Sequence, residues 1–225
     1  MQQVDAAIAA GTWTGLPRLF TWGRSNFGQL GLGNLTYYSS PKQVGSLTDW
    51  SVVASGVNND SAVKKDGTLW IWGYNVNGQL GLGNTTSYSS PKQVGALTNW
   101  LKVSAGAYHS VAVKSDGTLW AWGNNDYGQL GYASGGGNRS SPQQIGALTD
   151  WYKSACGEVF TLSVKTDGTL WSWGYNSSGQ LGLGNGTSYS SPKQVGSLTT
   201  WSDVACGNDF SFGLKTDGTL WMWGK

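Results

Sequence analysis

A repeat of 50 or 51 residues constrains the fold of this chain more than any other feature of its sequence. One tryptophan recurs at that interval, as Trp22, Trp72, Trp122, Trp173 and Trp223. One proline does the same, as Pro41, Pro91, Pro142 and Pro192. The repeat divides the chain into residues 1–18, units 19–68, 69–118, 119–169 and 170–219, and a partial unit 220–225. A period of this length indicates that one supersecondary unit was copied and that neighbouring copies stack around a common core.

Each unit contains short apolar runs with the two-residue period of β-strands. Apolar side chains alternate in 69–73 (LWIWG) and 110–114 (SVAVK), and a third run is 100–106 (WLKVSAG). A weaker fourth run, 91–94 (PKQV), begins with a proline, which suits an edge strand. The Asp-Gly pair at 116–117, copied in the other units, predicts a tight turn between two of the strands. Four short antiparallel strands per repeat predict an all-β propeller of four-stranded blades.

Composition supports this fold and excludes several functions. The 35 glycines among 225 residues disfavour long helices, because each glycine inside a helix costs roughly 1 kcal/mol. The net charge is only +2, so we expect no nucleic-acid partner. The apolar runs are too short for membrane insertion. The N-terminus lacks the basic segment of a signal peptide, so we expect a cytoplasmic protein, or a virion or extracellular surface protein if a bacteriophage encodes it.

The repeat also resembles a known family. The string DGTLWxWGxNxxGQLGLGNxTxxSSPxQV is complete in 66–94 and in 167–195. It is similar to the regulator of chromosome condensation repeat, and the resemblance extends over 19–225. It implies a propeller whose family members usually close seven blades. The near-identical copies, rich in glycine and tryptophan, resemble those of bacterial and bacteriophage members.

The order of the strands leaves the two ends of the chain incomplete. If runs of the 100–106 type are the first strands of a blade, those of the 110–114 type the second, those of the 69–73 type the third and those of the 91–94 type the fourth, the repeats begin with a third and a fourth strand and end with a first, a second and a third. We expect about four blades, three of them complete, with 1–18 as an arm or a degenerate partial blade, in which 4–11 weakly resembles a first strand. Two arrangements fit this pattern: a ring closed by joining the two ends, and an open arc completed by other chains.

Catalytic chemistry is not apparent in the sequence. His109 is the only histidine, which excludes a Ser-His-Asp triad and a multi-histidine metal site that use a second histidine. Cys156 and Cys206 end equivalent strands of adjacent blades; because packed sheets lie about 10 Å apart, we expect two buried free thiols. We therefore expect no enzyme activity, no metal and no cofactor, and a structural role for His109.

The variable positions of the repeat gather in two sets of loops that emerge on one face of an up-and-down blade. The loops after the first strands are 57–60, 107–110, 158–161 and 208–211. The loops after the third strands begin at 24–27, 74–77, 124–127 and 175–178, and the one insertion lies at 132–139. Aromatic and amide side chains on rigid loops suit recognition, although neutral drift of exposed loops explains the variation as well. The candidate binding residues are Asn58, Asn59, Asp60, Tyr74, Tyr108, Tyr127, His109, Glu158, Phe160, Tyr175, Asn208, Asp209 and Phe210.

The resulting hypothesis is a non-catalytic structural or binding propeller with a protein or glycan partner, able to form a homo-oligomer or to join a larger assembly. The resemblance to bacteriophage members favours a virion surface, tail-fibre or adhesin component. Two alternatives follow from the same resemblance: guanine-nucleotide exchange on a small GTPase, and inhibition of an enzyme by the loops. The exchange hypothesis is the weaker, because no unit gains more than one residue and no basic tail is present.

Overall fold

The computed structural model describes residues 18–132 and 137–225, and all regular structure in these residues is β-strand. The first sheet holds β1 (Phe20–Gly23) and β2 (Tyr38–Gln43). The second holds β3 (Trp50–Ser55), β4 (Asn59–Lys64), β5 (Leu69–Gly73) and β6 (Tyr88–Gln93). The third holds β7 (Trp100–Ala105), β8 (His109–Lys114), β9 (Leu119–Gly123) and β10 (Arg139–Gln144).

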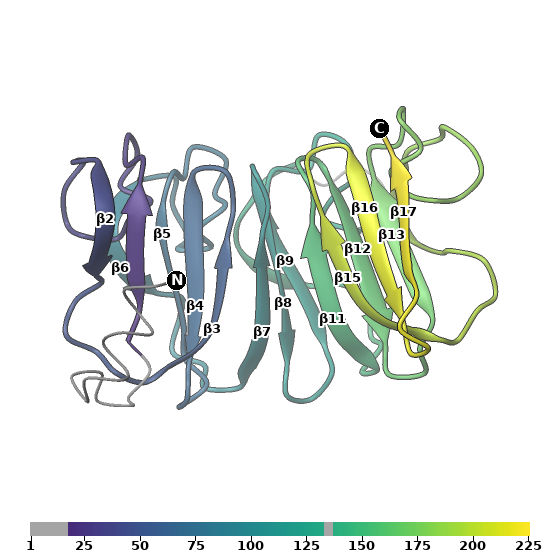
Figure 1. Cartoon of the computed structure of the whole chain (residues 1–225), viewed down its shortest axis with the longest axis horizontal. Coiled ribbons are helices and arrows are strands. Elements are labelled where there is room, and N and C mark those ends of the chain that lie inside the picture. Colours follow the sequence, from purple (N-terminus) through teal and green to yellow (C-terminus); the bar gives the residue numbers. More distant parts are fainter. Residues whose placement is uncertain (1–17, 133–136) are drawn as a thin grey trace.

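The fourth sheet holds β11 (Trp151–Cys156), β12 (Phe160–Lys165), β13 (Leu170–Gly174) and β14 (Tyr189–Gln194). The fifth holds β15 (Trp201–Cys206), β16 (Phe210–Lys215) and β17 (Leu220–Gly224). Every sheet is antiparallel and follows chain order, and the five sheets stand side by side in an arc (Figure 1). This confirms the predicted propeller blades, with three complete sheets between two partial ones.

The strands differ from the predicted runs mainly in the fourth strand of each blade. In the second sheet that strand begins at Tyr88, three residues before the proline that opens the predicted run. Its pairing with β5 shifts register between the pairs Gly73–Tyr88 and Ile71–Lys92, so the strand is irregular where Pro91 lies. An outer strand tolerates proline because one of its edges needs no backbone donor.

The Asp-Gly-Thr turn after each second strand is fixed by its own side chains. The Asp116 carboxylate accepts hydrogen bonds from the Thr118 amide at 3.0 Å and the Thr118 hydroxyl at 2.6 Å. The same hydroxyl accepts a bond of 2.9 Å from Trp120 Nε1. Gly117 has φ +77°, and a Cβ there would lie 2.0 Å from the Thr149 carbonyl oxygen. The turn sequence therefore recurs because Asp116 and Thr118 supply its hydrogen bonds and position 117 has no room for a Cβ.

Neighbouring blades are joined through the Gly-Gln-Leu-Gly segment. Trp122 in β9 is buried, and its Nε1 donates to the Gln79 carbonyl oxygen of the preceding blade at 2.9 Å. Gly81 lies against this ring, because a Cβ there would be 2.8 Å from Trp122 Nε1. Equivalent bonds run from Trp72 to Gln29, from Trp173 to Gln129 and from Trp223 to Gln180. The recurring tryptophan and the glycines around the glutamine thus form one inter-blade joint.

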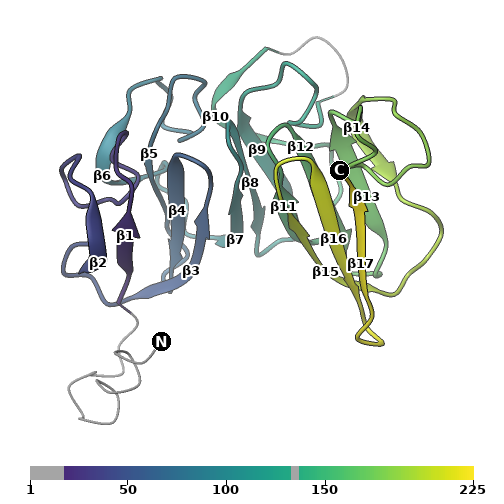
Figure 2. The same cartoon turned by 45° about the horizontal axis from the view of Figure 1, so that its top comes forward.

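The arc is open in the described residues. The sheet of β1 and β2 and the sheet of β15 to β17 lie at opposite ends of it, as Figures 1 and 2 show from two directions. A ring closed by joining these two ends, one of the two arrangements considered above, is not what the structure shows. The segment 4–11, considered above as a weak first strand, lies outside the described residues. No helix in the described ranges could span a membrane.

Candidate binding face

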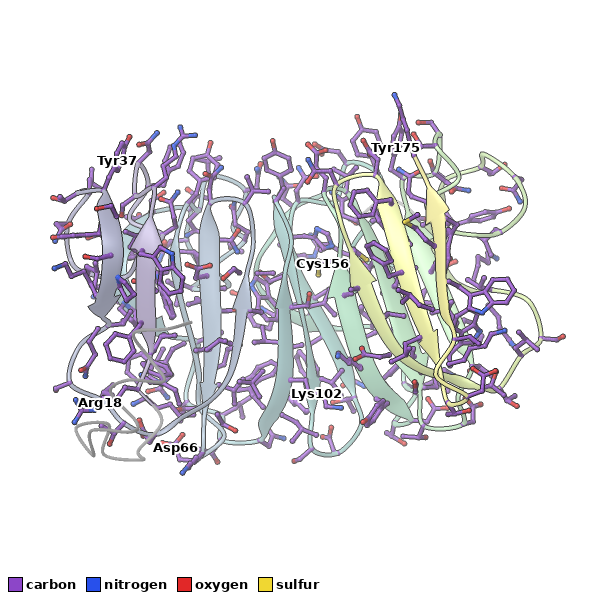
Figure 3. All side chains as sticks on the ribbon, in the orientation of Figure 1. Arg18, Tyr37, Asp66, Lys102, Cys156 and Tyr175 are labelled. Atoms are coloured by element: carbon purple, nitrogen blue, oxygen red, sulfur yellow. The ribbon has the colours of Figure 1, made fainter. Side chains whose placement is uncertain are left out.

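The loops after the first and third strands of each blade lie together on one side of the arc, which we call the loop face. Tyr37 and Tyr175 mark it at the upper edge of Figure 3, and Asp66 marks the opposite turn face. A backbone bond ties the two loops in each complete blade. These bonds run from Tyr74 N to Asn58 O (2.9 Å), from Asn124 N to Tyr108 O (2.8 Å) and from Tyr175 N to Val159 O (3.0 Å). The variable positions therefore share a continuous surface.

The loop between β5 and β6 is held in shape by a buried asparagine. Asn75 Nδ2 donates to the carbonyl oxygens of Asn84 and Thr86 at 3.0 and 2.8 Å, and Asn75 Oδ1 accepts from Leu80 N at 2.9 Å. Asn176 makes the equivalent bonds in the loop between β13 and β14. These asparagines form the scaffold of the loops, and they leave the tyrosines beside them to present contact atoms.

Aromatic side chains pair across two of the blade joints on this face. The rings of Tyr127 and Tyr175, from neighbouring loops, have centroids 4.8 Å apart and are tilted by 59°. Phe27 and Tyr74 form a matching pair at 4.5 Å and 56°. Such tilted pairs stabilise each other by about 0.5–1.5 kcal/mol beyond their buried area. Tyr127 stays exposed, so the pairs provide rigid aromatic surface at the outside of the molecule.

A shallow pocket of about 220 Å³ opens where the first strands of the blades end. Its wall consists of small residues at equivalent positions, namely Ser55, Gly56, Ala105, Gly106, Cys156, Gly157, Cys206 and Gly207. Glu158 and Asn208 lie at its rim, and Glu158 N donates to Asn208 O at 3.2 Å. The pocket offers one carboxylate and several backbone groups, and it can accept a small polar side chain of a partner.

The two cysteines of this pocket are free thiols, as predicted, but only Cys156 is buried and Cys206 is partly exposed. Burial raises the pKa of Cys156 to about 12, and its thiol donates to the Ser104 carbonyl oxygen at 3.5 Å. Burial is also the largest cause that holds the pKa of Cys206 well above its usual range. Both thiols are therefore protonated near neutral pH, and neither has the thiolate character that a nucleophile requires.

His109 is completely buried beside the pocket. The Thr161 hydroxyl donates to the Gln129 carbonyl oxygen at 2.9 Å, so its oxygen accepts a bond of 3.0 Å from His109 Nε2–H. Burial lowers the pKa of His109 to about 3, which keeps the imidazole neutral. The side chain holds two strands together, in line with the structural role expected for it. No group of three or more potential ligands that could hold a metal ion occurs within residues 18–132 and 137–225.

The structure separates the candidate binding residues into two groups. Asn59, His109 and Phe160 are fully buried, so their side chains cannot touch a partner in this conformation. This corrects their inclusion: the third position after the loop glycine is buried in the three complete sheets, and Phe210, which holds it in the last sheet, is only partly buried. The others have solvent-accessible surface, and they are Asn58, Asp60, Tyr74, Tyr108, Tyr127, Glu158, Tyr175, Asn208, Asp209 and Phe210.

Two details of the face were not apparent in the sequence. Phe27 belongs to it through its pair with Tyr74, and its position in the loop is the one that Tyr127 holds two units later. Tyr132, the first residue of the insertion, turns inward, with its hydroxyl 2.6 Å from the carbonyl oxygens of Ala121 and Gln143. Residues 133–136 of the insertion lie outside the described residues.

Comparison with known proteins agrees with this architecture. A family model described as the RCC1-like domain matches residues 7–225. The chain belongs to the RCC1-like domain family. A curated relative of this RCC1-like chain, the mitochondrial RCC1 domain-containing protein RUG3 of Arabidopsis thaliana, is 43% identical over 51 residues, which are 22% of the chain and 12% of that protein.

Solved structures show how much of a propeller the RCC1-like chain contains. Human WBSCR16 superposes with a TM-score of 0.80 at 24% identity, over 92% of this chain and 56% of that chain. Prp20p of Saccharomyces cerevisiae superposes with a TM-score of 0.74 at 26% identity, over 88% of this chain and 52% of that chain. The RCC1-like chain therefore has the same curvature as these propellers, and it spans about half of their length. It spans only 12% of the curated Arabidopsis relative.

Proposed function

We propose that this RCC1-like chain is a non-catalytic binding module that holds a protein partner on its loop face. The observation on which this rests is the two aromatic pairs of the loop face, Tyr127 with Tyr175 and Phe27 with Tyr74. A buried asparagine fixes the loop that carries Tyr74, and another fixes the loop that carries Tyr175. Tyrosines that are already ordered supply contact area and a hydroxyl at low entropic cost. The neighbouring 220 Å³ pocket gives the same surface a recess for one polar side chain.

A glycan is the second ligand class that this surface suits, because sugar rings stack on exposed tyrosines such as Tyr127. The virion, tail-fibre or adhesin role stays a prediction from the sequence, as does inhibition of an enzyme by the loops. Each of these roles would use the same face, so identification of the partner decides among them.

The first experiment identifies what touches the loop face. A photo-crosslinking amino acid is placed at Tyr175, and in a matched chain at Leu148, which is exposed on the turn face. After irradiation in an extract of the source cells, we expect a defined protein adduct from position 175 and none from position 148. Equal adducts from both positions would remove the case for the loop face. Binding on a glycan array with no protein adduct would reassign the ligand class.

Nucleotide exchange is a second candidate, favoured by one comparison. Prp20p, which is 26% identical over 88% of this chain, binds Gsp1p and histones. The test measures release of a fluorescent guanine nucleotide from Gsp1p with and without the chain. We expect the release rate to stay at its uncatalysed value, and an acceleration of tenfold or more would favour the exchange hypothesis over a purely binding role.

A further inference from the structure

Three loops of the repeat hold an asparagine in the same bend at the surface, in the sequence Gly-Asn-x-Thr. In the loop between β5 and β6, Asn84 Oδ1 accepts from Thr86 N at 2.9 Å, and Asn84 Nδ2 donates to the Leu82 carbonyl oxygen at 3.3 Å. Asn185 makes the same two bonds, at 3.3 and 2.9 Å, in the loop between β13 and β14. Asn34 does so in the loop between β1 and β2. The three side-chain amides are therefore held in one orientation.

The copies differ in the residue that follows the asparagine. The two earlier asparagines precede Leu35 and Thr85, whereas Asn185 precedes Gly186. The backbone nitrogen after an asparagine can attack the side-chain carbonyl carbon, and a side chain on the following residue hinders that attack. Asn185 and Gly186 are both exposed, and Gly186 N donates no hydrogen bond within residues 18–132 and 137–225. Gly186 N is therefore accessible and unhindered as a nucleophile.

The bend also activates the carbonyl group that is attacked. Thr187 N–H donates to Asn185 Oδ1 at 2.9 Å. A hydrogen-bond donor at this oxygen stabilises the negative charge that develops on it when the carbon becomes tetrahedral. The loop thus combines an unhindered nucleophile with a polarised carbonyl.

A second Asn-Gly pair, Asn77-Gly78, is protected by the fold. Gly78 is buried, and its N donates to the Asn75 carbonyl oxygen at 2.9 Å. A Cβ on Gly78 would lie 2.6 Å from Ser140 Cα, so the backbone is tightly packed there. Attack on the Asn77 side chain requires this bond to break and the packed backbone to turn. The same dipeptide is therefore exposed in one blade and protected in another.

We propose that Asn185 is a modification site, at which the folded chain converts asparagine into aspartate and isoaspartate with water as the only co-reactant. Gly186 N forms a bond to Asn185 Cγ, the bond from Cγ to Nδ2 breaks, and Nδ2 leaves as ammonia with the proton that Gly186 N gives up. Water then opens the resulting cyclic imide at one of its two carbonyl carbons, which gives aspartate or isoaspartate. No oxidation or reduction occurs.

The conversion changes a loop of the loop face. Either product adds a carboxylate, and isoaspartate also adds one carbon atom to the backbone path. Asn176 Nδ2 donates to the Asn185 carbonyl oxygen at 2.9 Å, so the modified residue contacts the scaffold of the loop that carries Tyr175. The modification therefore alters the surface to which the partner is assigned, although its chemistry does not depend on that assignment.

Peptide mapping by mass spectrometry measures the conversion. The folded chain is incubated in mildly alkaline buffer, and fragment ions that distinguish aspartate from isoaspartate identify the product at each asparagine. We expect conversion at Asn185 to be at least about tenfold faster than at Asn84 or Asn77, which is a difference of about 1.4 kcal/mol in activation free energy. No conversion at Asn185, or an equal rate at Asn77 in the folded chain, would overturn the inference.

Exchange of the following residue between two loops tests the cause. Gly186→Thr should slow the conversion at Asn185 by at least about tenfold. The folded chain tolerates this change, because a Cβ at position 186 meets no atom nearer than Asn176 O at 3.7 Å. Thr85→Gly, at an exposed position, should make Asn84 about as reactive as Asn185. Undiminished conversion in Gly186→Thr, or an unreactive Asn84 in Thr85→Gly, would contradict the assigned cause.

Unfolding in urea tests the protection of the second Asn-Gly pair. In the unfolded chain Asn77 should convert about as fast as Asn185, because the bond from Gly78 N to Asn75 O is lost. If Asn77 stays slow in urea, the neighbouring sequence and not the fold protects it, and the structural argument fails.

Discussion

Asp60 occupies the place that a hydroxyl holds in the later blades. There Ser110, Thr161 and Ser211 donate to the glutamine carbonyl of the preceding blade at 2.9, 2.9 and 2.7 Å. Burial is the largest cause that raises the pKa of Asp60 to about 7, against which a hydrogen bond from Ser55 acts. A protonated carboxyl provides a donor at this place, and an ionised one does not.

We predict from this residue that the stability of the chain falls as the pH rises. In the unfolded chain Asp60 titrates near 3.8, and in the folded chain near 7, so the folded state binds more protons between these values. The free energy of unfolding should therefore be highest below pH 4 as far as this group is concerned, and should fall by about 1.4 kcal/mol per unit of pKa difference as the pH rises to 7. Urea unfolding at a series of pH values measures it.

The matched variant is Asp60→Ser, which introduces the residue found at positions 110 and 211. This variant should reduce the change in the free energy of unfolding between pH 4 and 7, and it should raise the free energy of unfolding at pH 7. An unchanged pH profile in this variant would show that another group is responsible.

Lys114 is a buried ammonium with a neutral neighbour. Its Nζ lies over the rings of Trp100 and Trp120 at 4.7 and 3.6 Å, and burial lowers its pKa. In the following blade the equivalent Lys165 has an ion pair with Asp150 at 3.2 Å, whereas Asn99 holds the corresponding position beside Lys114.

We predict that Asn99→Asp stabilises the chain. A carboxylate at this position would pair with the buried ammonium, and we expect the free energy of unfolding at pH 7 to rise by up to about 1 kcal/mol. The reverse substitution, Asp150→Asn in the next blade, should lower it by a similar amount in the same denaturation experiment. A loss of stability in Asn99→Asp would contradict the pairing.

At the scale of the structural element, the joint formed by Trp122, Gln79 and Gly81 determines how blades stack. Gly81 and Gly83 have similar backbone conformations, with φ +67° and +75°. A Cβ on Gly81 would lie 2.8 Å from Trp122 Nε1, whereas one on Gly83 would meet its nearest atom at 3.6 Å. A comparison of alanine substitutions at the two glycines therefore separates the free-energy cost of the positive φ from the cost of a clash with Trp122.

We predict that Gly81→Ala is clearly more destabilising than Gly83→Ala. Both variants should lose roughly 1–2 kcal/mol through the positive φ. Gly81→Ala should lose about 0.5–1.5 kcal/mol more because the Trp122 bond to Gln79 is displaced. Equal losses in thermal unfolding would show that the tryptophan shifts at no cost and that this bond does not fasten the joint.

The periodic elements could be predicted from the sequence, and the side-chain direction at their ends could not. The alternation in LWIWG predicts the bounds of β5, since Leu69 and Ile71 belong to one apolar cluster and Trp70 and Trp72 to another. The second strands begin earlier than the alternation indicates, at residues such as His109 and Phe160. That early start turns both side chains into the blade, which is why residues read as loop contacts are buried.

At the scale of the whole molecule, the repeat predicted the number of complete sheets because each copy of the sequence adds one set of strands. It left closure undecided, since strand order alone does not set the angle between blades. That angle follows from the packing of tryptophans such as Trp122 between sheets, and it gives an open arc with uncovered residues Trp22 and Leu220 at its ends. The aromatic pairs of the loop face depend on the same stacking, because each pair joins loops of two blades.

The measurement that tests the proposed function most directly is the affinity of the captured partner for two matched double variants. Tyr127→Ala with Tyr175→Ala removes the aromatic pair of the loop face, and Leu148→Ala with Leu198→Ala removes two exposed apolar side chains of the turn face. With melting temperatures recorded for both, calorimetry should show at least about tenfold weaker binding for the tyrosine variant, or about 1.4 kcal/mol, and no change for the leucine variant. Unchanged binding by the tyrosine variant, or a loss confined to the leucine variant, would contradict the assignment of the loop face.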